Sequence, residues 1–360
     1  MSSFDALGVY PWLVRLPLAA FAGGSVSTRP LIGYVSVPDR DSAQSRPHSP
    51  VKGQDRSVDV DQSADGRGAH IEADRSRRMF QMNYHNILVL VDAGKASKAR
   101  LAVAIDLARR CNASLTGVFL STTFLATFGA REAVAFMTPE DISRLLDEQV
   151  AAVSAASARA RTPFESAVRE AGVPCFWEEV SGDGSEYLIA AARRHDLSIL
   201  PSICHVGVSD HVVSAAEVGM ACGSPVLVAP EGRYQPPAGR RVLIAWKDSR
   251  EAARALNDAW PILCRAETIQ VLKIGDEVEA ALDPMLLRQL ALHGCPEPHV
   301  VVDRDSDAST GEILRRHIGV SGADLVVMGL YGHSRLREIV LGGVSRDLLH
   351  DTPAALLMSH

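Results

Sequence analysis

Apolar and polar positions follow a regular pattern from Ile87 to the end of the chain. Short runs rich in Val, Ile and Leu alternate with longer stretches in which apolar residues recur every three or four positions. The short runs predict strands and the longer stretches predict helices, an alternation that is typical of βαβ units in an α/β fold with a parallel sheet. The predicted strands are Ile87–Val91, Leu115–Leu120, Cys175–Val180, Leu197–Leu200, Val226–Ala229, Val242–Trp246, Ile269–Lys273, Val300–Val302, Leu325–Met328 and Ala354–Met358.

The strand pattern indicates a duplication, because five strands before residue 230 recur as five strands after residue 240. The same number of residues separates Asp196 from Pro225 and Asp324 from Pro353, and in both copies the proline opens the last strand. The first copy is longer between its first and fourth strands, and we place the extra residues at 121–149. We therefore expect a first domain at 83–230, a stiff Gly- and Pro-containing linker at 231–239 and a second domain at 240–360.

The first 82 residues lack this pattern. The stretch from Ser27 to Arg78 is rich in Ser, Pro, Asp, Arg and Gly, so it cannot bury enough apolar surface to offset the entropy of ordering, and we expect it to be disordered. The apolar stretch from Val9 to Gly24 is interrupted by charge and proline and fits a secretory signal peptide poorly. Two alternatives stay open: a real disordered tail, or a native start at Met79 or Met82.

Composition narrows the class of protein. With 360 residues, 47% of them hydrophobic, the chain is long enough for about two domains. The net charge of -6 provides no basic field to recruit nucleic acid or an anionic membrane surface. The six cysteines contain no C-x-x-C pair, which argues against a zinc knuckle or a dense disulfide framework and favours reduced thiols in a cytoplasmic protein.

The residues with the clearest chemistry follow the fourth strand of the second copy. Gly329 and Gly332 allow the chain to turn sharply off a buried strand, and Gly342 and Gly343 open a helix that carries Val344 and Leu348 on its buried side. A glycine-lined helix start offers free amide donors and the positive end of the helix dipole, and Ser345 adds a hydroxyl donor. Ligands of open parallel sheets bind beyond the carboxyl ends of the strands, so this segment predicts a phosphate site.

These glycines resemble the signature of the universal stress protein family: Gly, two residues, Gly, nine residues, Gly, then Ser or Thr. Gly329, Gly332 and Gly342 fit that spacing, Gly343 stands in place of the hydroxyl residue, and Ser345 follows two positions later. The resemblance covers residues 83–360 as two tandem domains. It implies a doubly wound sheet of the adenine nucleotide alpha-hydrolase type in each domain, with strand order 3-2-1-4-5, and pairing of the two fifth strands.

The resemblance also implies that ATP or AMP, with or without Mg²⁺, lies across the ends of the first and fourth strands. Family members that bind ATP often carry an acidic residue at the end of the first strand, where this copy has Lys247, with Asp248 one position later. Residues 245–248 would border the adenine and ribose, and Lys273 and Ile274 at the end of the second strand would form the opposite wall of the site. The predicted nucleotide-binding residues are Ala245, Lys247, Asp248, Lys273, Ile274, Met328, Gly329, Gly332, His333, Gly342, Gly343, Val344 and Ser345.

The first copy has different residues at the matching positions. Pro201, Cys204, Ser214, Ala215 and Glu217 replace the glycines and the serine, so one amide donor is lost and a carboxylate stands at the helix start. We predict that the first domain does not bind nucleotide.

Three functions remain in view. The first is a non-enzymatic, nucleotide-responsive stress protein, the second is an interaction scaffold with both sites decayed, and the third is a slow ATPase, for which no carboxylate or histidine is convincingly placed. His333 would contact phosphate or act as a general acid, or is simply a solvated loop histidine. No P-loop or G-x-S-x-G motif occurs, and Cys204, His205 and His211 lack a fourth ligand for a metal. The expected partner is an adenine nucleotide, neither nucleic acid nor a membrane is expected, and a homodimer or protein partner stays open.

Overall fold

A computed structural model describes residues 83–92, 94–121, 137–181, 185–205, 212–230, 237–275, 284–330, 348–349 and 353–360. All of them lie in one compact unit at residues 61–360. The predicted disordered extension at 1–82 and the start of the linker lie outside the described residues.

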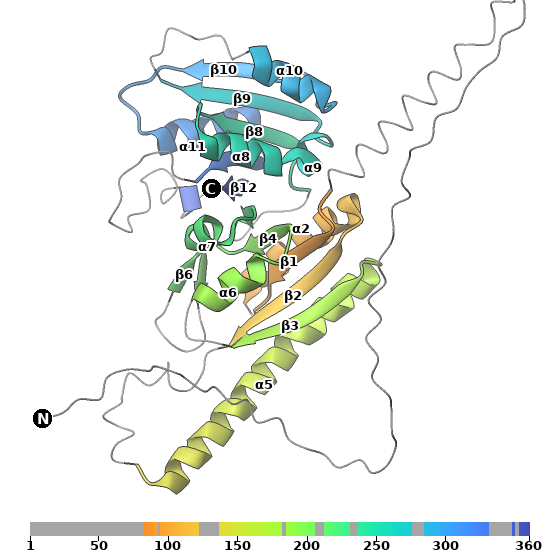
Figure 1. Ribbon diagram of the computed structural model, residues 1–360, viewed down its shortest axis with the longest axis vertical. Coiled ribbons are helices and arrows are strands. Elements are labelled where there is room, and N and C mark those ends of the chain that lie inside the picture. Colours follow the sequence, from red (N-terminus) through yellow and green to blue (C-terminus); the bar gives the residue numbers. More distant parts are fainter. Residues whose placement is uncertain are drawn as a thin grey trace, which may run out of the picture. The chain divides into compact units, whose positions relative to one another are not determined.

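The first half of the described chain forms five parallel strands with helices between them (Figure 1). A two-stranded antiparallel sheet, β5–β6, accompanies them. In chain order the elements are β1 (Asn86–Leu90), α2 (Lys95–Cys111), β2 (Ser114–Ser121), α5 (Pro139–Glu170), β3 (Cys175–Ser181), α6 (Ser185–Ala192), β4 (Leu197–Leu200), β5 (Ile203–His205), β6 (Val212–Ser214), α7 (Ala215–Cys222) and β7 (Val226–Val228).

The second half repeats the five strands. Its elements are β8 (Arg241–Trp246), α8 (Arg250–Asp258), α9 (Trp260–Leu263), β9 (Thr268–Ile274), α10 (Pro284–Leu292), β10 (His299–Asp303), α11 (Thr310–Ser321), β11 (Leu325–Gly329) and β12 (Ala355–Ser359). The ten strands form one sheet in the order β10-β9-β8-β11-β12-β7-β4-β1-β2-β3. Each half therefore has the predicted order 3-2-1-4-5, and the α/β fold is confirmed.

Burial explains why the strands were predictable. Successive residues of a strand point to opposite faces of the sheet, and both faces are covered here. Ile87 and Val89 face a core formed with α2, α5, α8, α9 and α10, whereas Leu88 and Leu90 face a core formed with α6, α7 and α11. Continuous apolar runs result, and each predicted strand matches an observed one to within one residue at either end.

Equivalent aspartates hold the first and fourth strands together in each half. The carboxylate of Asp196 accepts the backbone amides of His85 (2.7 Å) and Asn86 (3.1 Å) before β1. The carboxylate of Asp324 accepts the amide of Gly239 (2.7 Å) and those of the two residues that follow it, before β8. In each half, the aspartate just before the fourth strand therefore binds the amino end of the first strand through hydrogen bonds.

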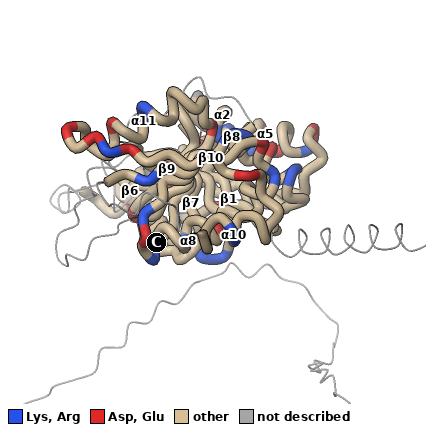
Figure 2. Tube along the Cα trace, turned by 90° about the horizontal axis from the view of Figure 1, so that it is seen from above, with Lys and Arg blue, Asp and Glu red and all other residues tan. Residues whose placement is uncertain are grey.

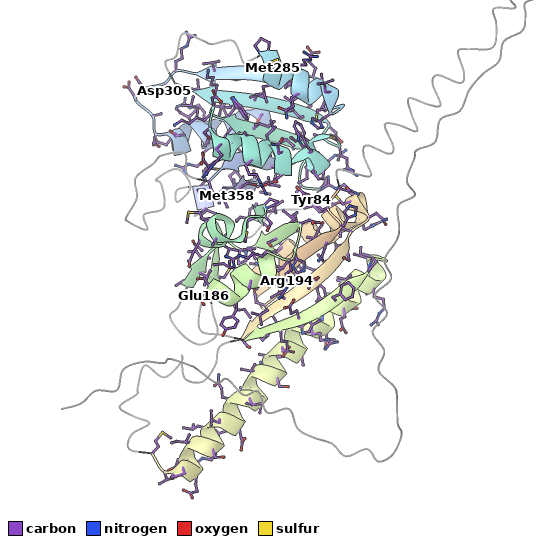
Figure 3. The ribbon with its side chains drawn as sticks, viewed as in Figure 1. Tyr84, Glu186, Arg194, Met285, Asp305 and Met358 are labelled. Carbon is purple, nitrogen blue, oxygen red and sulfur yellow. The ribbon has the colours of Figure 1, made fainter. Side chains whose placement is uncertain are left out.

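The two halves meet at their fifth strands, as the resemblance implies. β12 pairs in parallel with β11 and antiparallel with β7, where Met358 lies opposite Val226. The hydroxyl of Tyr84 in the first half donates a hydrogen bond of 2.6 Å to the carbonyl of Asp258 in the second. Tyr84 and Met358 are both labelled in Figure 3. The sheet and its buried faces therefore continue from one half into the other.

The longest helix, α5, begins in the predicted insertion. Thr138 caps it, since its hydroxyl accepts the amide of Asp141 at 3.2 Å. Its buried residues, Ser157, Ala160, Phe164 and Val168, all belong to its second half, and in Figure 1 its first half extends past the sheet. Among the described residues, we find no helix with the length and apolar character that crossing a membrane requires.

Candidate functional site

The strand order reverses between β8 and β11, so the predicted crevice lies at their carboxyl ends. The last residue pair between the two strands is Ala245 with Met328, and on the other side of β8, Trp246 pairs with Lys273 of β9. Three predicted site residues, Ala245, Met328 and Lys273, therefore end neighbouring strands at the same edge of the sheet.

Side chains at this edge include one small residue, Ala245, and two lysines. Ala245 is half-buried, Lys247 and Asp248 are exposed, and Lys273 and Ile274 are half-buried. Lysines near a crevice attract phosphate oxygens through long-range Coulomb forces. Figure 2 shows positive and negative segments mixed over the rest of the trace, in keeping with the modest net charge.

Gly329 is required by packing against α8. A Cβ atom at Gly329 would lie 2.6 Å from the carbonyl carbon of Glu251 and 2.7 Å from the backbone nitrogen of Ala252. Only glycine allows β11 to end this close to the first turn of α8. Gly329 was predicted to allow a sharp turn after the strand. Its close approach to α8 is a second reason why glycine is needed there.

The first turn of α8 is already satisfied by its own residues. The hydroxyl of Ser249 accepts the amide of Ala252 at 3.3 Å. Hydrogen bonds, first from its own backbone amide and then from Ser249 and Arg250, hold the pKa of Glu251 below its usual range, against the effect of burial. The helix start is therefore occupied by a carboxylate and a hydroxyl, and phosphate would have to be held elsewhere in the crevice.

A buried hydroxyl without a partner lies beside Gly329. Ser359 at the end of β12 pairs in register with Gly329, and its side-chain oxygen has no hydrogen-bond partner among the described residues. Its backbone carbonyl accepts the amide of Leu330 at 2.7 Å. A buried hydroxyl that lacks a partner costs free energy, so Ser359 is a polar group at this strand end that the described residues leave unsatisfied.

In the first half, the side chain of Arg100 lies at the carboxyl end of the first strand. The Arg100 side chain is 2% exposed. Its Nε donates a hydrogen bond of 2.8 Å to the carbonyl of Leu90, and one Nη donates a hydrogen bond of 2.5 Å to the carboxylate of Asp92. Leu90 ends β1, and Asp92 stands where the second half has Lys247. The position that corresponds to Arg100 in the second half is Ala255.

Two residues that follow β4, Cys204 and Glu217, form the other side of the first-half crevice. Burial raises the pKa of Cys204, which follows β4, to about 12, although Arg100 opposes that shift. The charges of Asp92 and Glu217 act on the same thiol. Glu217 lies in the first turn of α7. The backbone amide of Glu217 donates a hydrogen bond of 3.1 Å to the hydroxyl of Ser214, the residue that caps this helix. The carboxyl ends of β1 and β4 thus carry charged residues of the chain itself, of which Arg100 is buried and paired with Asp92.

Comparison with known proteins decides the fold. No protein-family model and no curated protein matches the sequence. A universal stress protein from Archaeoglobus fulgidus matches 76% of this chain over 97% of its own, with 16% sequence identity and a TM-score of 0.59. This chain has the universal stress protein fold.

Solved structures of the universal stress protein fold also match part of the chain. UspA from Lactobacillus plantarum is 14% identical over 35% of this chain and 100% of its own, with a TM-score of 0.29. A universal stress protein in complex with cAMP is 19% identical over 34% of this chain and 98% of its own, with a TM-score of 0.28.

The glycine-rich part of the predicted site lies outside the described residues. This applies to Gly332, His333, Gly342, Gly343, Val344 and Ser345. Leu348 in the helix that follows is fully buried, as its predicted position requires. The described residues that the structure brings together are those at the ends of β8, β9 and β11.

Sequence reasoning missed Arg100 and Ser359. A signal for Arg100 exists: it lies beside Leu101 on a helix whose other buried residues are apolar except for Ser97, so a charge there is unusual for a core face. Ser359 lies one residue beyond the predicted last strand and gave no signal. Across the described ranges, no three His, Cys, Asp or Glu side chains form a group able to hold a metal ion.

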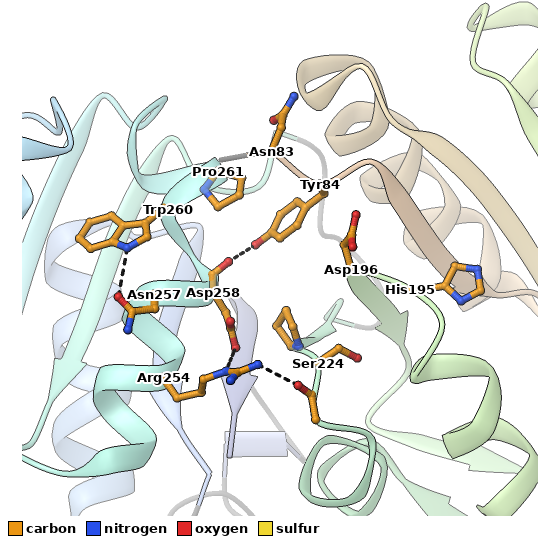
Figure 4. Close-up of a pocket in the computed structure, with 12 residues that line it drawn as sticks. Asn83, Tyr84, His195, Asp196, Ser224, Arg254, Asn257, Asp258, Trp260 and Pro261 are labelled. Carbon is orange, nitrogen blue, oxygen red and sulfur yellow. Dashed lines mark hydrogen bonds and ion pairs between the residues drawn. The ribbon is translucent and has the colours of Figure 1, made fainter. Parts of the chain in front are cut away.

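A separate pocket of about 360 Å³ lies at the amino ends of the first-half strands (Figure 4). Its polar groups are already paired: Arg254 bonds Asp258 and the carbonyl of Gly223, both at 2.9 Å, and the indole of Trp260 donates to Asn257 at 3.2 Å. The pocket is lined by residues of both halves and marks their junction.

Proposed function

We propose that this chain belongs to the universal stress protein family and binds ATP or AMP in the second half only, as a non-enzymatic, nucleotide-responsive regulator. The observation that carries the proposal is the difference between the two crevices. Arg100 and Asp92 fill the first, whereas Ala245 and two lysines border the second.

The described residues fit an adenine nucleotide in the second half. Ala245 has the smallest side chain that a strand end can carry besides glycine, which leaves room for a ring. Lys247 and Lys273 add positive charge at the ends of β8 and β9, which favours an anionic ligand, and the Ser359 hydroxyl lacks a partner among the described residues. When bound, the nucleotide would supply charge and contacts that bias the packing of this half toward one state.

The alternative is a nucleotide-independent interaction scaffold. Lys247 favours it, because family members that bind ATP often carry an acidic residue there. A scaffold would show the same fold and the same closed first crevice, so only a binding measurement separates the two functions.

The deciding experiment is titration calorimetry of the full chain with ATP and AMP up to millimolar concentration, since cellular ATP makes even a weak site occupied. We expect one site per chain. Gly332→Asp and Gly342→Val should each raise Kd at least tenfold, about 1.4 kcal/mol, while circular dichroism stays unchanged. Absence of heat and of co-purified nucleotide in the wild type would leave the scaffold function.

Charge variants refine the same test. Lys273→Gln should weaken ATP binding by about five- to tenfold and AMP binding less, because ATP carries more negative charge. Lys98→Gln removes an exposed lysine from α2 in the first half and is the matched control. Equal effects of the two substitutions would contradict the placement of the phosphates in the second half.

A further inference from the structure

Two cysteines in the second half lie in contact although they are far apart in sequence. Cys264 ends α9, and Cys295 follows α10. The Cys264 thiol lies 3.3 Å from the backbone carbonyl of His293, within the turn that leads to Cys295. The Cys264 side chain is also close enough to Cys295 to raise the pKa of its thiol. The two side chains therefore lie beside the same turn before any bond joins them.

The surroundings hold this contact in place. The indole of Trp260, at the start of α9, stacks on the His293 ring with centroids 3.9 Å apart. The amide of Cys295 donates to the carbonyl of Leu290 at 3.1 Å, and Leu290 is fully buried. Both ends of the contact thus belong to ordered, packed turns, which reduces the movement that a covalent bond would need.

Access distinguishes this pair from the other cysteines. Cys264 and Cys295 are half-buried, so a small oxidant can reach them. Cys111, Cys204 and Cys222 are buried, and Cys175 is exposed on the edge strand β3. Cys264 precedes β9 and Cys295 precedes β10, so the pair lies at the amino edge of the sheet, opposite the predicted nucleotide crevice.

We propose that Cys264 and Cys295 form a reversible disulfide when the protein meets a peroxide, and that this modification fastens α9 to the turn after α10. One thiol attacks hydrogen peroxide, which gives a sulfenic acid and water. The second thiol then attacks the sulfenic sulfur, the S–S bond forms and a second water leaves. Both sulfurs are oxidised by one electron each, and the two peroxide oxygens are reduced.

The reduced pair is stable under ordinary conditions. The hydrogen bond to Cys264, followed by burial, raises the pKa of the Cys295 thiol, so its thiolate is scarce at neutral pH. Because the thiolate is the reactive form, oxidation responds to a sustained oxidant rather than to trace oxygen. The disulfide closes a loop of the chain, which restricts the unfolded state and should stabilise the folded second half.

Peptide mapping tests the proposal without nucleotide, in a Cys175→Ser background that removes the exposed thiol. Trypsin separates the two cysteines into peptides 255–265 and 289–304, each with a single cysteine. After peroxide treatment we expect these peptides to be linked, with loss of two hydrogens, and to separate on reduction. Oxidation should raise the thermal midpoint by about 5 °C, and Cys264→Ser and Cys295→Ser should each abolish both effects.

Several results would overturn the proposal. They are two unlinked peptides with free thiols or sulfinic acids after peroxide, linkage of either peptide to another cysteine, and a linked protein with an unchanged midpoint. None of them bears on nucleotide binding, since the two sites lie at opposite edges of the sheet.

Discussion

At the scale of single residues, the two halves differ by a buried charge that only the first half carries at this position. Arg100 is almost fully buried, and its charge is balanced by Asp92, whose side chain is 50% exposed. Removing one member of a buried pair is costly because the other charge stays buried without a partner. Half of Asp92 lies in water, so the cost must be smaller than for a fully buried pair.

We therefore expect Asp92→Asn to lower the free energy of unfolding by about 2 kcal/mol in urea denaturation. Glu165→Gln is the matched control, because it removes an exposed helical ion pair with Arg161 and should cost about 0.3 kcal/mol. A similar loss in both variants would show that Arg100 does not depend on Asp92.

At the scale of elements, the end of β11 is fixed by its contact with α8. Gly329→Ala would place a methyl group 2.6 Å from the backbone of Glu251, where neither strand nor helix has a flexible side chain that can yield. We expect a loss of about 2 kcal/mol in unfolding free energy, from forced separation of the two elements. Weaker nucleotide binding should accompany it if the crevice binds nucleotide.

Gly319→Ala is the control for that prediction. Gly319 lies in α11 of the same half, and a Cβ atom there would meet nothing within 4 Å. Alanine is favoured over glycine inside a helix, so this variant should be neutral or more stable by about 0.5–1 kcal/mol. Equal destabilisation by both alanines would mean that the α8 contact is not the cause.

The strands were predictable because burial on both faces of the sheet requires a run of apolar residues, as Val226–Val228 shows with all three residues apolar and buried. Helix α5 was not delimited from the sequence, since all its buried residues belong to its second half and the pattern of the first half is correspondingly weak. The pair β5–β6 was missed because strands of three residues leave almost no periodic signal. The strand ends that border the predicted site, as at Ala245, could be located from the sequence, and nucleotide binding there stays a prediction. Arg100 was missed because a charge on a core face contradicts the rule used to find the core.

At the scale of the whole described unit, the halves share one sheet and one pair of apolar faces. Leu227 of β7 pairs with Leu357 of β12, and both residues are fully buried in the same cluster. A strand that bonds to both halves cannot unfold without exposing apolar surface on each side. The duplicated sequence predicts two domains, whereas the junction predicts that they unfold together.

Two sets of tryptophan variants test this cooperativity in a Trp12→Phe background. Trp177 reports on the first half, and Trp246 with Trp260 reports on the second, so removing one set isolates the other. We expect coincident urea transitions from the two reporters, because two-state unfolding requires every probe to agree. Leu357→Ala should lower both midpoints together, with a loss of about 3 kcal/mol. Separate transitions, or a shift confined to the second-half reporters, would show instead that β7 and β12 part before either half unfolds.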